Sequence, residues 1–228
     1  MKRGFSILAI ITALLLSFAL YEALVAAPTE RTMGDVQRIF YYHVPSAWTA
    51  LLLFLINFVS SIVYLIRKSA KADILALVSA EVGVVFCTVV LVTGPIWAKP
   101  VWGIWWDPAD IRLNSTLALW LIYISYLILR KFSTSSKTAS IAAAWAVFGA
   151  LDVPFVFFSI WFFRTQHPSP VIAQGGSLDP AMGRVLLINW AAFLCLAWLV
   201  CWTRYRLEVL KREVEEAQAL ESLHEVSR

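Results

Sequence analysis

Two of the three histidines in this sequence stand in segments that suit a shared metal. His43 lies in the run YYHVP (residues 41–45) and His167 in the run RTQHP (residues 164–168), whereas His224 lies close to the end of the chain. Neutral imidazole is a common axial ligand of haem iron, and two such ligands must approach the iron from opposite faces. A lone histidine near a helix end is usually structural or solvated, so the prediction of an iron site depends on His43 and His167 lying close together.

A segment rich in tryptophan lies between these two histidines. It contains Trp97, Trp102, Trp105 and Trp106, and the last three have the i, i+3, i+4 spacing that a helical turn would place on one face. Indole rings supply the large flat apolar surface that a porphyrin needs. Tryptophan also collects at membrane interfaces, but such a belt is spread over many helix ends rather than gathered in one segment. We therefore expect the four tryptophans to form a platform for haem.

Three cations lie in or near the same segments. Haem carries two propionate groups, and guanidinium and ammonium groups form strong charge-assisted hydrogen bonds with carboxylates. We expect Lys99, Arg112 and Arg164 to contact the propionate edge of the haem.

Two acidic residues stand inside apolar stretches, where a charge is costly and often functional. Glu81 lies in the first half of one stretch, and Asp152 lies in the middle of another, two residues before Pro154. These acids could relay protons. They could equally form hydrogen bonds between helices, with Asn189 or a backbone group freed by Pro154 as the partner.

The elements that position these residues must be membrane helices. The chain has 228 residues, of which 60% are hydrophobic and 15% charged, and its mean hydropathy is +0.73. Soluble domains contain about 45–50% apolar and about 25% charged residues, so an ordinary soluble enzyme and a disordered chain are excluded. The net charge of +4 does not indicate a nucleic-acid partner, because the basic residues are sorted by membrane side. Cys87, Cys195 and Cys201 form no CxxC or CxxCH motif, so covalent haem attachment is not predicted.

Six apolar stretches are long enough to cross about 30 Å of hydrocarbon as helices. The fourth reaches full length only if its helix begins near Ile111, with Arg112 extending back to the surface. The first resembles a signal peptide, but its apolar stretch is longer than the usual signal core, and we expect a retained helix. The predicted spans are Phe5–Leu24, Pro45–Ile66, Asp73–Thr93, Ser115–Leu129, Ala139–Phe163 and Val185–Tyr205.

The placement of lysine and arginine predicts the orientation of these spans. Thirteen of the 19 lysines and arginines lie on the side that also holds both termini, so both termini are expected to be cytoplasmic. The external loop between the third and fourth spans then carries the tryptophan segment, and the two histidines face the same side. We expect residues 1–206 to form one transmembrane domain. Residues 207–228 are expected to form a solvated cytoplasmic helical tail, supported by an i,i+4 pair of Glu208 and Arg212.

The tryptophan segment, at residues 95–114, resembles the WWD motif of the haem-handling proteins of cytochrome c biogenesis. With the six spans and the two histidine runs, the chain is similar to the haem exporter protein C (CcmC) family of the cytochrome c maturation system over Asp35–Trp190. One residue is added in the middle of the motif and one tryptophan is missing, so either Asp107 or Asp110 takes the place of the motif aspartate, and Asn114 replaces the usual threonine. The residues that match the motif are Trp102, Gly103, Trp105, Trp106, Arg112 and Leu113.

This resemblance implies a haem-handling protein that is not an enzyme. It assigns His43 and His167 as the axial ligands of a non-covalent haem b, adds Gly103 to the platform, and places Asp107 or Asp110 at the haem edge. Glu81 matches an acid often found in the third span of the family. The site would lie at the outer face of a bacterial cytoplasmic (inner) membrane. The implied partners are the lipid bilayer, the periplasmic haem chaperone CcmE, the ABC transporter subunits CcmA and CcmB and the small helper CcmD, and no nucleic acid.

Two other functions suit a bundle of membrane helices, and the sequence favours them less. A small di-haem cytochrome b that reduces or oxidises quinone needs histidine pairs inside its helices, and no predicted span contains a histidine. A solute carrier with an aromatic gate is allowed by Glu81 and Asp152, but carriers often contain internal repeats, and the sequence shows none.

Overall fold

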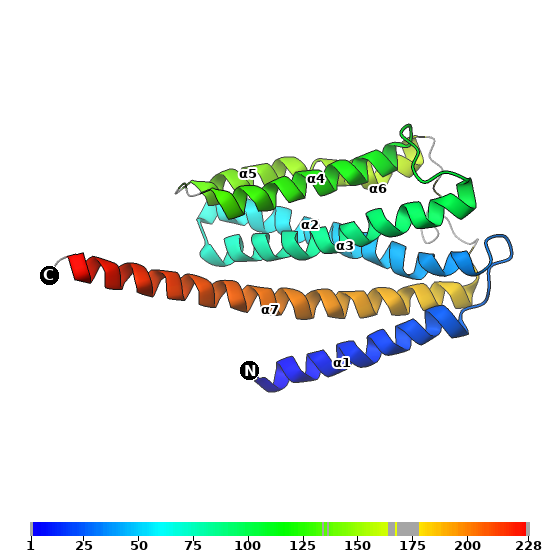
Figure 1. Cartoon of the computed structure of the whole chain (residues 1–228), viewed down its shortest axis with the longest axis horizontal. Helices are drawn as coiled ribbons and strands as arrows, with labels where there is room; N and C mark the ends of the chain where they lie inside the picture. Colours follow the sequence, from blue (N-terminus) through cyan, green and yellow to red (C-terminus); the bar gives the residue numbers. More distant parts are fainter. Residues whose placement is uncertain (1, 134, 136, 164–166, 168–177, 227–228) are drawn as a thin grey trace.

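The computed structural model describes residues 2–133, 135, 137–163, 167 and 178–226. Within these residues the regular structure is helical, apart from one isolated bridge between Glu30 and Gly34. Six helical segments are long and apolar enough to cross a membrane, which confirms the predicted number of spans. The fold is that of an all-α integral membrane protein (Figure 1).

Successive spans run in opposite directions along one elongated bundle, and both ends of the chain lie at the same end of it (Figure 1). We call this the terminal end, and we call the opposite end, which holds His43 and Trp102, the tryptophan end. A short π-helix, η1 (Glu22–Ala26), and a 3-10 helix, η2 (Asp35–Ile39), flank the connection between the first two spans. The α-helices are α1 (Lys2–Tyr21), α2 (Phe40–Arg67), α3 (Ala70–Trp102), α4 (Ile111–Phe132), α5 (Thr138–Gly149), α6 (Asp152–Phe162) and α7 (Pro180–Val226).

The outer surface of the bundle is strongly apolar. Leu14 on α1, Phe162 on α6 and Trp198 on α7 are 67%, 76% and 66% exposed. A continuous surface of this kind is unfavourable in water, whereas contact with lipid removes the cost. The exposed side chains therefore support the membrane assignment independently of helix length.

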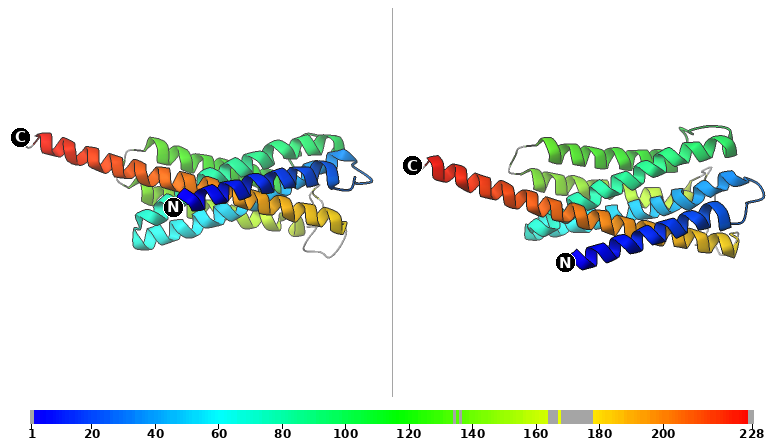
Figure 2. Two further views of the ribbon diagram at one scale, coloured as in Figure 1. Left: turned by 90° about the horizontal axis from the view of Figure 1, so that it is seen from below. Right: turned by 60° about the horizontal axis from the view of Figure 1, so that its bottom comes forward.

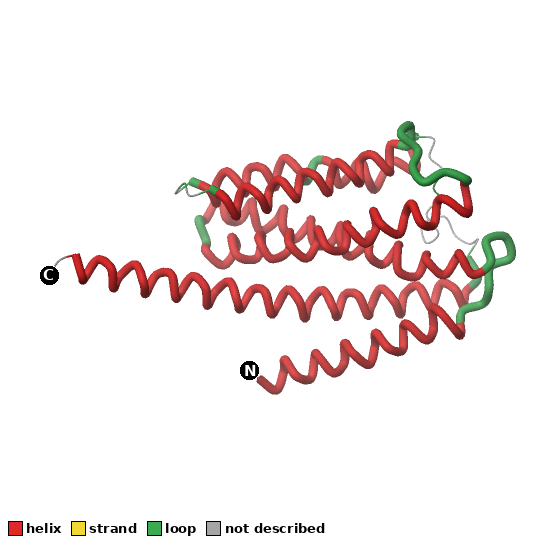
Figure 3. The backbone as a smooth tube through the Cα atoms, viewed as in Figure 1, coloured by secondary structure: helices red, strands yellow, loops and turns green. Residues whose placement is uncertain are grey.

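The third span is longer than the sequence predicts. Helix α3 does not end at Thr93 but continues to Trp102, with Pro95 and Pro100 inside it, so the first half of the expected external loop is helical (Figure 3). Proline removes a backbone hydrogen bond, but membrane helices tolerate it where neighbouring groups satisfy the freed carbonyl. Pro95, Trp97, Pro100 and Trp102 therefore lie on an extension of a membrane helix.

The chain reverses direction in the short connection between α3 and α4. Gly103 ends α3 with a φ of 78°, a left-handed conformation that glycine adopts without strain. Because the helix ends there, Trp105 and Trp106 do not share a helical face with Trp102, and the prediction from their spacing is wrong. Helix α4 begins at Ile111, as the length argument predicts.

The fifth span is not one continuous helix. Helix α5 ends at Gly149 and α6 begins at Asp152, so Asp152 lies at a helix break rather than in the middle of a helix. Pro154 stands in the first turn of α6, where its missing N–H group costs little. Together the two short helices still form one segment, Thr138–Phe162, that is long and apolar enough to cross a membrane.

The core of the bundle is the contact between α2 and α3. At Gly83 of α3, a Cβ atom would lie 2.8 Å from Cε1 of Phe54 on α2, so glycine allows the two helices to approach each other closely. The Phe54 ring in turn stacks on Tyr123 of α4, with the ring centroids 3.9 Å apart. The buried faces of these three helices thus meet in one apolar cluster.

Buried ion pairs fasten α7 to the terminal end. Asp73, in the first turn of α3, binds Arg130 of α4 at 2.9 Å and Arg212 of α7 at 2.8 Å. Arg212 also binds Glu208 at 3.0 Å, which confirms the predicted i,i+4 pair. The expectation of a tail that is solvated from its start is wrong, because α7 continues unbroken past Tyr205 and its next two turns pack on the bundle (Figure 2).

Candidate functional site

The two predicted histidines lie at one small cavity at the tryptophan end. His43 is in the first turn of α2 rather than before the helix, and His167 is in the connection between α6 and α7. The cavity has a volume of about 160 Å³, and most of its other walls are apolar. It is lined by Met33, His43, Gly94, Trp97, Ala98, Val101, Trp102, Leu113 and His167.

Three residues of α3 hold His43 in place. Its Nδ1 atom lies 2.9 Å from Oγ1 of Thr93, and its ring meets the Trp97 indole edge to face, with the centroids 5.8 Å apart. Gly94 brings the backbone of α3 close to the ring, because a Cβ atom at that position would lie 3.4 Å from Cε1 of His43, in van der Waals contact. The histidine is buried, so α3 rather than solvent sets its orientation.

His167 has a matching set of neighbours. Its ring meets the Trp102 indole edge to face, with the centroids 5.4 Å apart, and its Nδ1 atom lies 3.7 Å from Oδ2 of Asp110. The other carboxylate oxygen, Oδ1, accepts the backbone N–H groups of Arg112 and Leu113, so the buried Asp110 also caps α4. Each histidine thus has one tryptophan of α3 against its ring and one protein oxygen beside Nδ1.

Trp97 is packed into the bundle instead of lying in a loop. Its ring is 6.1 Å from that of Phe40, and it contacts the apolar cluster formed by η1 and the neighbouring ends of α2 and α7. Its indole N–H group is buried and has no hydrogen-bond partner among the described residues.

The other two tryptophans of the predicted platform do not line the cavity. Trp105 is 58% exposed and Trp106 is partly buried, and both lie in the connection to α4. Lys99 supports this connection, because its ammonium group donates to the carbonyl of Gly103 at 2.9 Å and lies 6.0 Å from the Trp105 ring centroid. The platform expected from the sequence is thus divided between the cavity wall and the adjoining connection.

Arg112, Asp107 and Asp110, which are also predicted at the haem edge, lie in and around the same connection. Arg112 is in the first turn of α4, next to Asp110. The carboxylate of Asp107 accepts the N–H group of Ala109 at 2.9 Å and stabilises the turn before α4. Arg164 lies outside the described residues.

The two intramembrane acids are not part of the cavity wall. Glu81 binds the guanidinium of Arg204 on α7 through both carboxylate oxygens, each at 2.9 Å. Of the roles left open by the sequence, the structure shows contact between helices, but the partner is Arg204 and not Asn189. The amide of Asn189 instead donates to the carbonyls of Ala19 and Val185.

Asp152 forms no hydrogen bond with either partner considered for it, Asn189 or a backbone group freed by Pro154, among the described residues. Its Oδ2 atom is buried at the break between α5 and α6 and has no hydrogen-bond partner in the part of the chain that is described. The structure gives it no contact with the histidine cavity.

Sequence reasoning missed the residues that orient the histidines. Thr93 and Gly94 precede Trp97 by four and three positions, so on one helix they lie on the same face. That spacing becomes a signal only when α3 is known to continue past Thr93. Met33 and Val101 also line the cavity, and nothing in their sequence context marks them.

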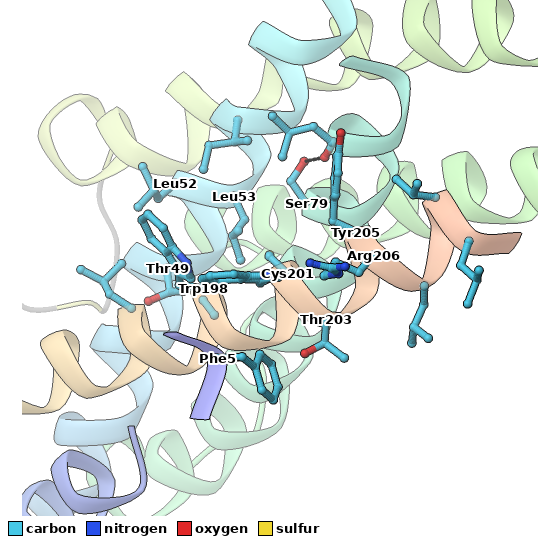
Figure 4. Close-up of a pocket in the computed structure, with 18 of the residues that line it drawn as sticks. Phe5, Thr49, Leu52, Leu53, Ser79, Trp198, Cys201, Thr203, Tyr205 and Arg206 are labelled. Carbon is cyan, nitrogen blue, oxygen red and sulfur yellow. Dashed lines mark hydrogen bonds between the residues drawn. The ribbon is translucent and has the colours of Figure 1, made fainter. Parts of the chain in front are cut away.

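A larger groove lies along α7, away from the histidines (Figure 4). It has a volume of about 1050 Å³ and is bounded by α7, α2, the start of α3 and Phe5 of α1. Its walls are mainly apolar and include Leu53, Trp198 and Trp202, but none of the predicted haem contacts. The small cavity is therefore the better candidate for an iron site, in spite of its size.

The known proteins that resemble this sequence along most of its length carry closely related names. The family described as "Heme exporter protein C" matches residues 1–220. A "Heme exporter protein C" of Bradyrhizobium diazoefficiens is 33% identical over 218 residues, which cover 94% of this chain and 82% of that protein. The "Heme exporter protein C" of Escherichia coli K12 is 31% identical over 188 residues, covering 82% of this chain and 76% of that protein. A "Putative cytochrome c biosynthesis ccmC-like mitochondrial protein" of Marchantia polymorpha is 33% identical over 183 residues, covering 80% of this chain and 78% of that protein.

Proposed function

The chain belongs to the heme exporter protein C family, and from this premise we propose that it binds haem b at the tryptophan end and hands it on during cytochrome c maturation. The observation that carries the proposal is that His43 and His167 line the same cavity. Two imidazoles at one cavity are a suitable donor set for an iron that takes a ligand on each face.

The cavity suits haem in its chemistry and, in part, in its size. Its apolar walls, among them Val101 and Leu113, match the macrocycle. Its volume of about 160 Å³ is below the roughly 300–1,000 Å³ of most small-molecule sites. A whole haem exceeds this volume, so in the proposal the two histidines would hold its centre and the periphery would extend over the connection that holds Trp105 and Trp106.

In this proposal each residue has a defined task. His43 and His167 coordinate the iron, Trp97 and Trp102 fix the two imidazole rings, and Gly94 keeps space beside His43. The propionate contacts are proposed to come from Lys99, Arg112 and Arg164, with Asp107 or Asp110 at the haem edge. Because no cysteine motif could attach the haem covalently, binding is reversible, as transfer requires.

We also infer the orientation and the partners. The terminal end carries most of the lysines and arginines, so it is proposed to face the cytoplasm, with the tryptophan end outside the inner membrane of a bacterium. Haem would then pass to the periplasmic chaperone CcmE, next to CcmA, CcmB and CcmD. The chain is proposed to carry haem without catalysing a reaction.

Haem retention by the purified protein tests the proposal. The wild type, His43→Ala, His167→Ala and His224→Ala are titrated with haemin in detergent and followed by their Soret absorption. We expect one haem per chain in the wild type and in His224→Ala, the matched control in the exposed tail, and weaker binding in the other two. Equal binding in all four proteins would overturn the axial assignment, and no binding by the wild type would overturn the function.

A further inference from the structure

We propose that Thr93 is a positioning residue that fixes the tautomer of His43, placing the proton on Nδ1 and leaving the lone pair of Nε2 for the iron. The inference rests on the proposed haem function and extends it to a residue that does not itself line the cavity but contacts His43, which does. It comes from the hydrogen bonds made by one threonine hydroxyl.

The hydroxyl of Thr93 has two short contacts and only one hydrogen to give. Its Oγ1 atom lies 2.7 Å from the carbonyl oxygen of Val89, one turn earlier in α3, and 2.9 Å from Nδ1 of His43. A carbonyl oxygen can only accept, so the hydroxyl hydrogen must point to Val89 for that bond to form. Both bonds form together only if Nδ1 of His43 carries a hydrogen and donates it to Thr93.

This assignment determines what the other ring nitrogen can do. A neutral imidazole carries one hydrogen, so a protonated Nδ1 leaves Nε2 as the nitrogen that can bind a metal. Nε2 of His43 forms no hydrogen bond with any described residue. Residues that hold the far nitrogen of a metal-binding histidine fix both its tautomer and its ring orientation.

The surroundings of His167 follow the same arrangement. Its Nδ1 atom faces Oδ2 of Asp110 at 3.7 Å, and that carboxylate is fixed because its other oxygen caps α4. Both histidines thus present Nδ1 to an oxygen of the protein. For His43 this leaves Nε2 as the nitrogen that can bind an iron shared with His167.

Three variants separate this role from a purely structural one. Thr93→Val removes the hydroxyl but keeps the shape of the side chain, and Thr93→Ser keeps the hydroxyl. Thr203→Val is the matched control, because the hydroxyl of Thr203 makes the same bond to a carbonyl one turn earlier, Leu199, at 2.8 Å on an exposed part of α7. All three are purified as full-length protein, with the helical circular dichroism signal and melting temperature recorded.

The first measurement is the dissociation of haem into an excess of apomyoglobin. Loss of a residue that orients a metal-binding histidine typically weakens metal binding by about 10–100-fold. We expect Thr93→Val to lose haem at least about 10-fold faster than the wild type, and Thr93→Ser and Thr203→Val to stay close to the wild type. Wild-type rates in Thr93→Val, or equally fast loss in Thr93→Ser, would overturn the proposal.

The second measurement uses the protein without haem. With 15N-labelled histidine there are three imidazoles to observe, and His43→Ala identifies the signals of His43. We expect the wild type to hold His43 as the Nδ1–H tautomer and Thr93→Val to lose that preference. An Nε2–H tautomer in the wild type would refute the positioning role of Thr93 and leave the proposed function intact. Absence of haem binding by the wild type would refute the proposed function and leave the tautomer assignment intact.

Discussion

Asp73 is the residue of the terminal end whose loss should cost the most stability. Its side chain is 6% exposed and binds two guanidinium groups, of which that of Arg130 is only 9% exposed. Asp73→Ala leaves the buried charge of Arg130 without its partner. Removing one member of a buried pair costs about 3–5 kcal/mol, and we expect a loss in this range.

The same geometry predicts a smaller effect for Arg212. Its side chain is 29% exposed, and Arg212→Ala leaves Asp73 bound to Arg130, but it also removes the partner of Glu208, whose side chain is only 9% exposed. We expect Arg212→Ala to cost about 1–3 kcal/mol, more than an exposed pair and less than Asp73→Ala. The double variant Asp73→Ala/Arg130→Met removes both buried charges, so it should recover most of the stability lost in Asp73→Ala.

Unfolding of the purified proteins in detergent, followed by tryptophan fluorescence, measures these differences. Haem binding by the folded fraction should not change, because Asp73 and Thr93 are 20 residues apart on α3, or about 30 Å. The reasoning is refuted if Arg212→Ala destabilises the protein as much as Asp73→Ala, or if the double variant is less stable than Asp73→Ala.

Three further predictions concern the tryptophan end. Gly94→Ala should leave the melting temperature unchanged or raise it, because alanine favours a helix by about 1 kcal/mol over glycine. The new methyl group 3.4 Å from Cε1 of His43 should nevertheless weaken haem binding, and paired melting and haem titration experiments test this opposite response. Trp105→Ala should weaken haem binding without lowering the melting temperature, since the indole is 58% exposed. Trp97→Ala should weaken haem binding and also destabilise the protein by roughly 3 kcal/mol, the lower end of the range for truncating a packed aromatic side chain. The same two assays distinguish this result from that of Trp105→Ala.

The number of membrane spans was predictable because each span requires a long apolar run in the sequence, and these runs can be counted. The start of α4 at Ile111 was predictable for a similar reason, since a shorter helix could not cross the membrane. The continuation of α3 past Thr93 was not, because Pro95 and Pro100 indicate a loop in a soluble protein. In a membrane bundle, neighbouring groups satisfy the backbone, and these prolines can remain inside the helix.

Contacts between residues that are distant in the chain could not be predicted from the sequence. Charge placement puts Asp73, Arg130 and Arg212 at the same end of the bundle, but the packing of α3, α4 and α7 decides which of them pair. Glu81 is recognisable as costly and in need of a partner, yet nothing local indicates Arg204. At the candidate site the histidines and tryptophans are identifiable by residue type, whereas the residues that orient them depend on the helix register.

Electron paramagnetic resonance of the protein loaded with ferric haem tests most directly whether His43 and His167 bind the same iron. The account predicts a low-spin signal typical of two imidazole ligands in the wild type. Each single variant, His43→Ala or His167→Ala, should give a high-spin signal that added imidazole converts back to low spin. A low-spin spectrum that survives unchanged in either variant would show that the replaced histidine is not a ligand, and would contradict the account.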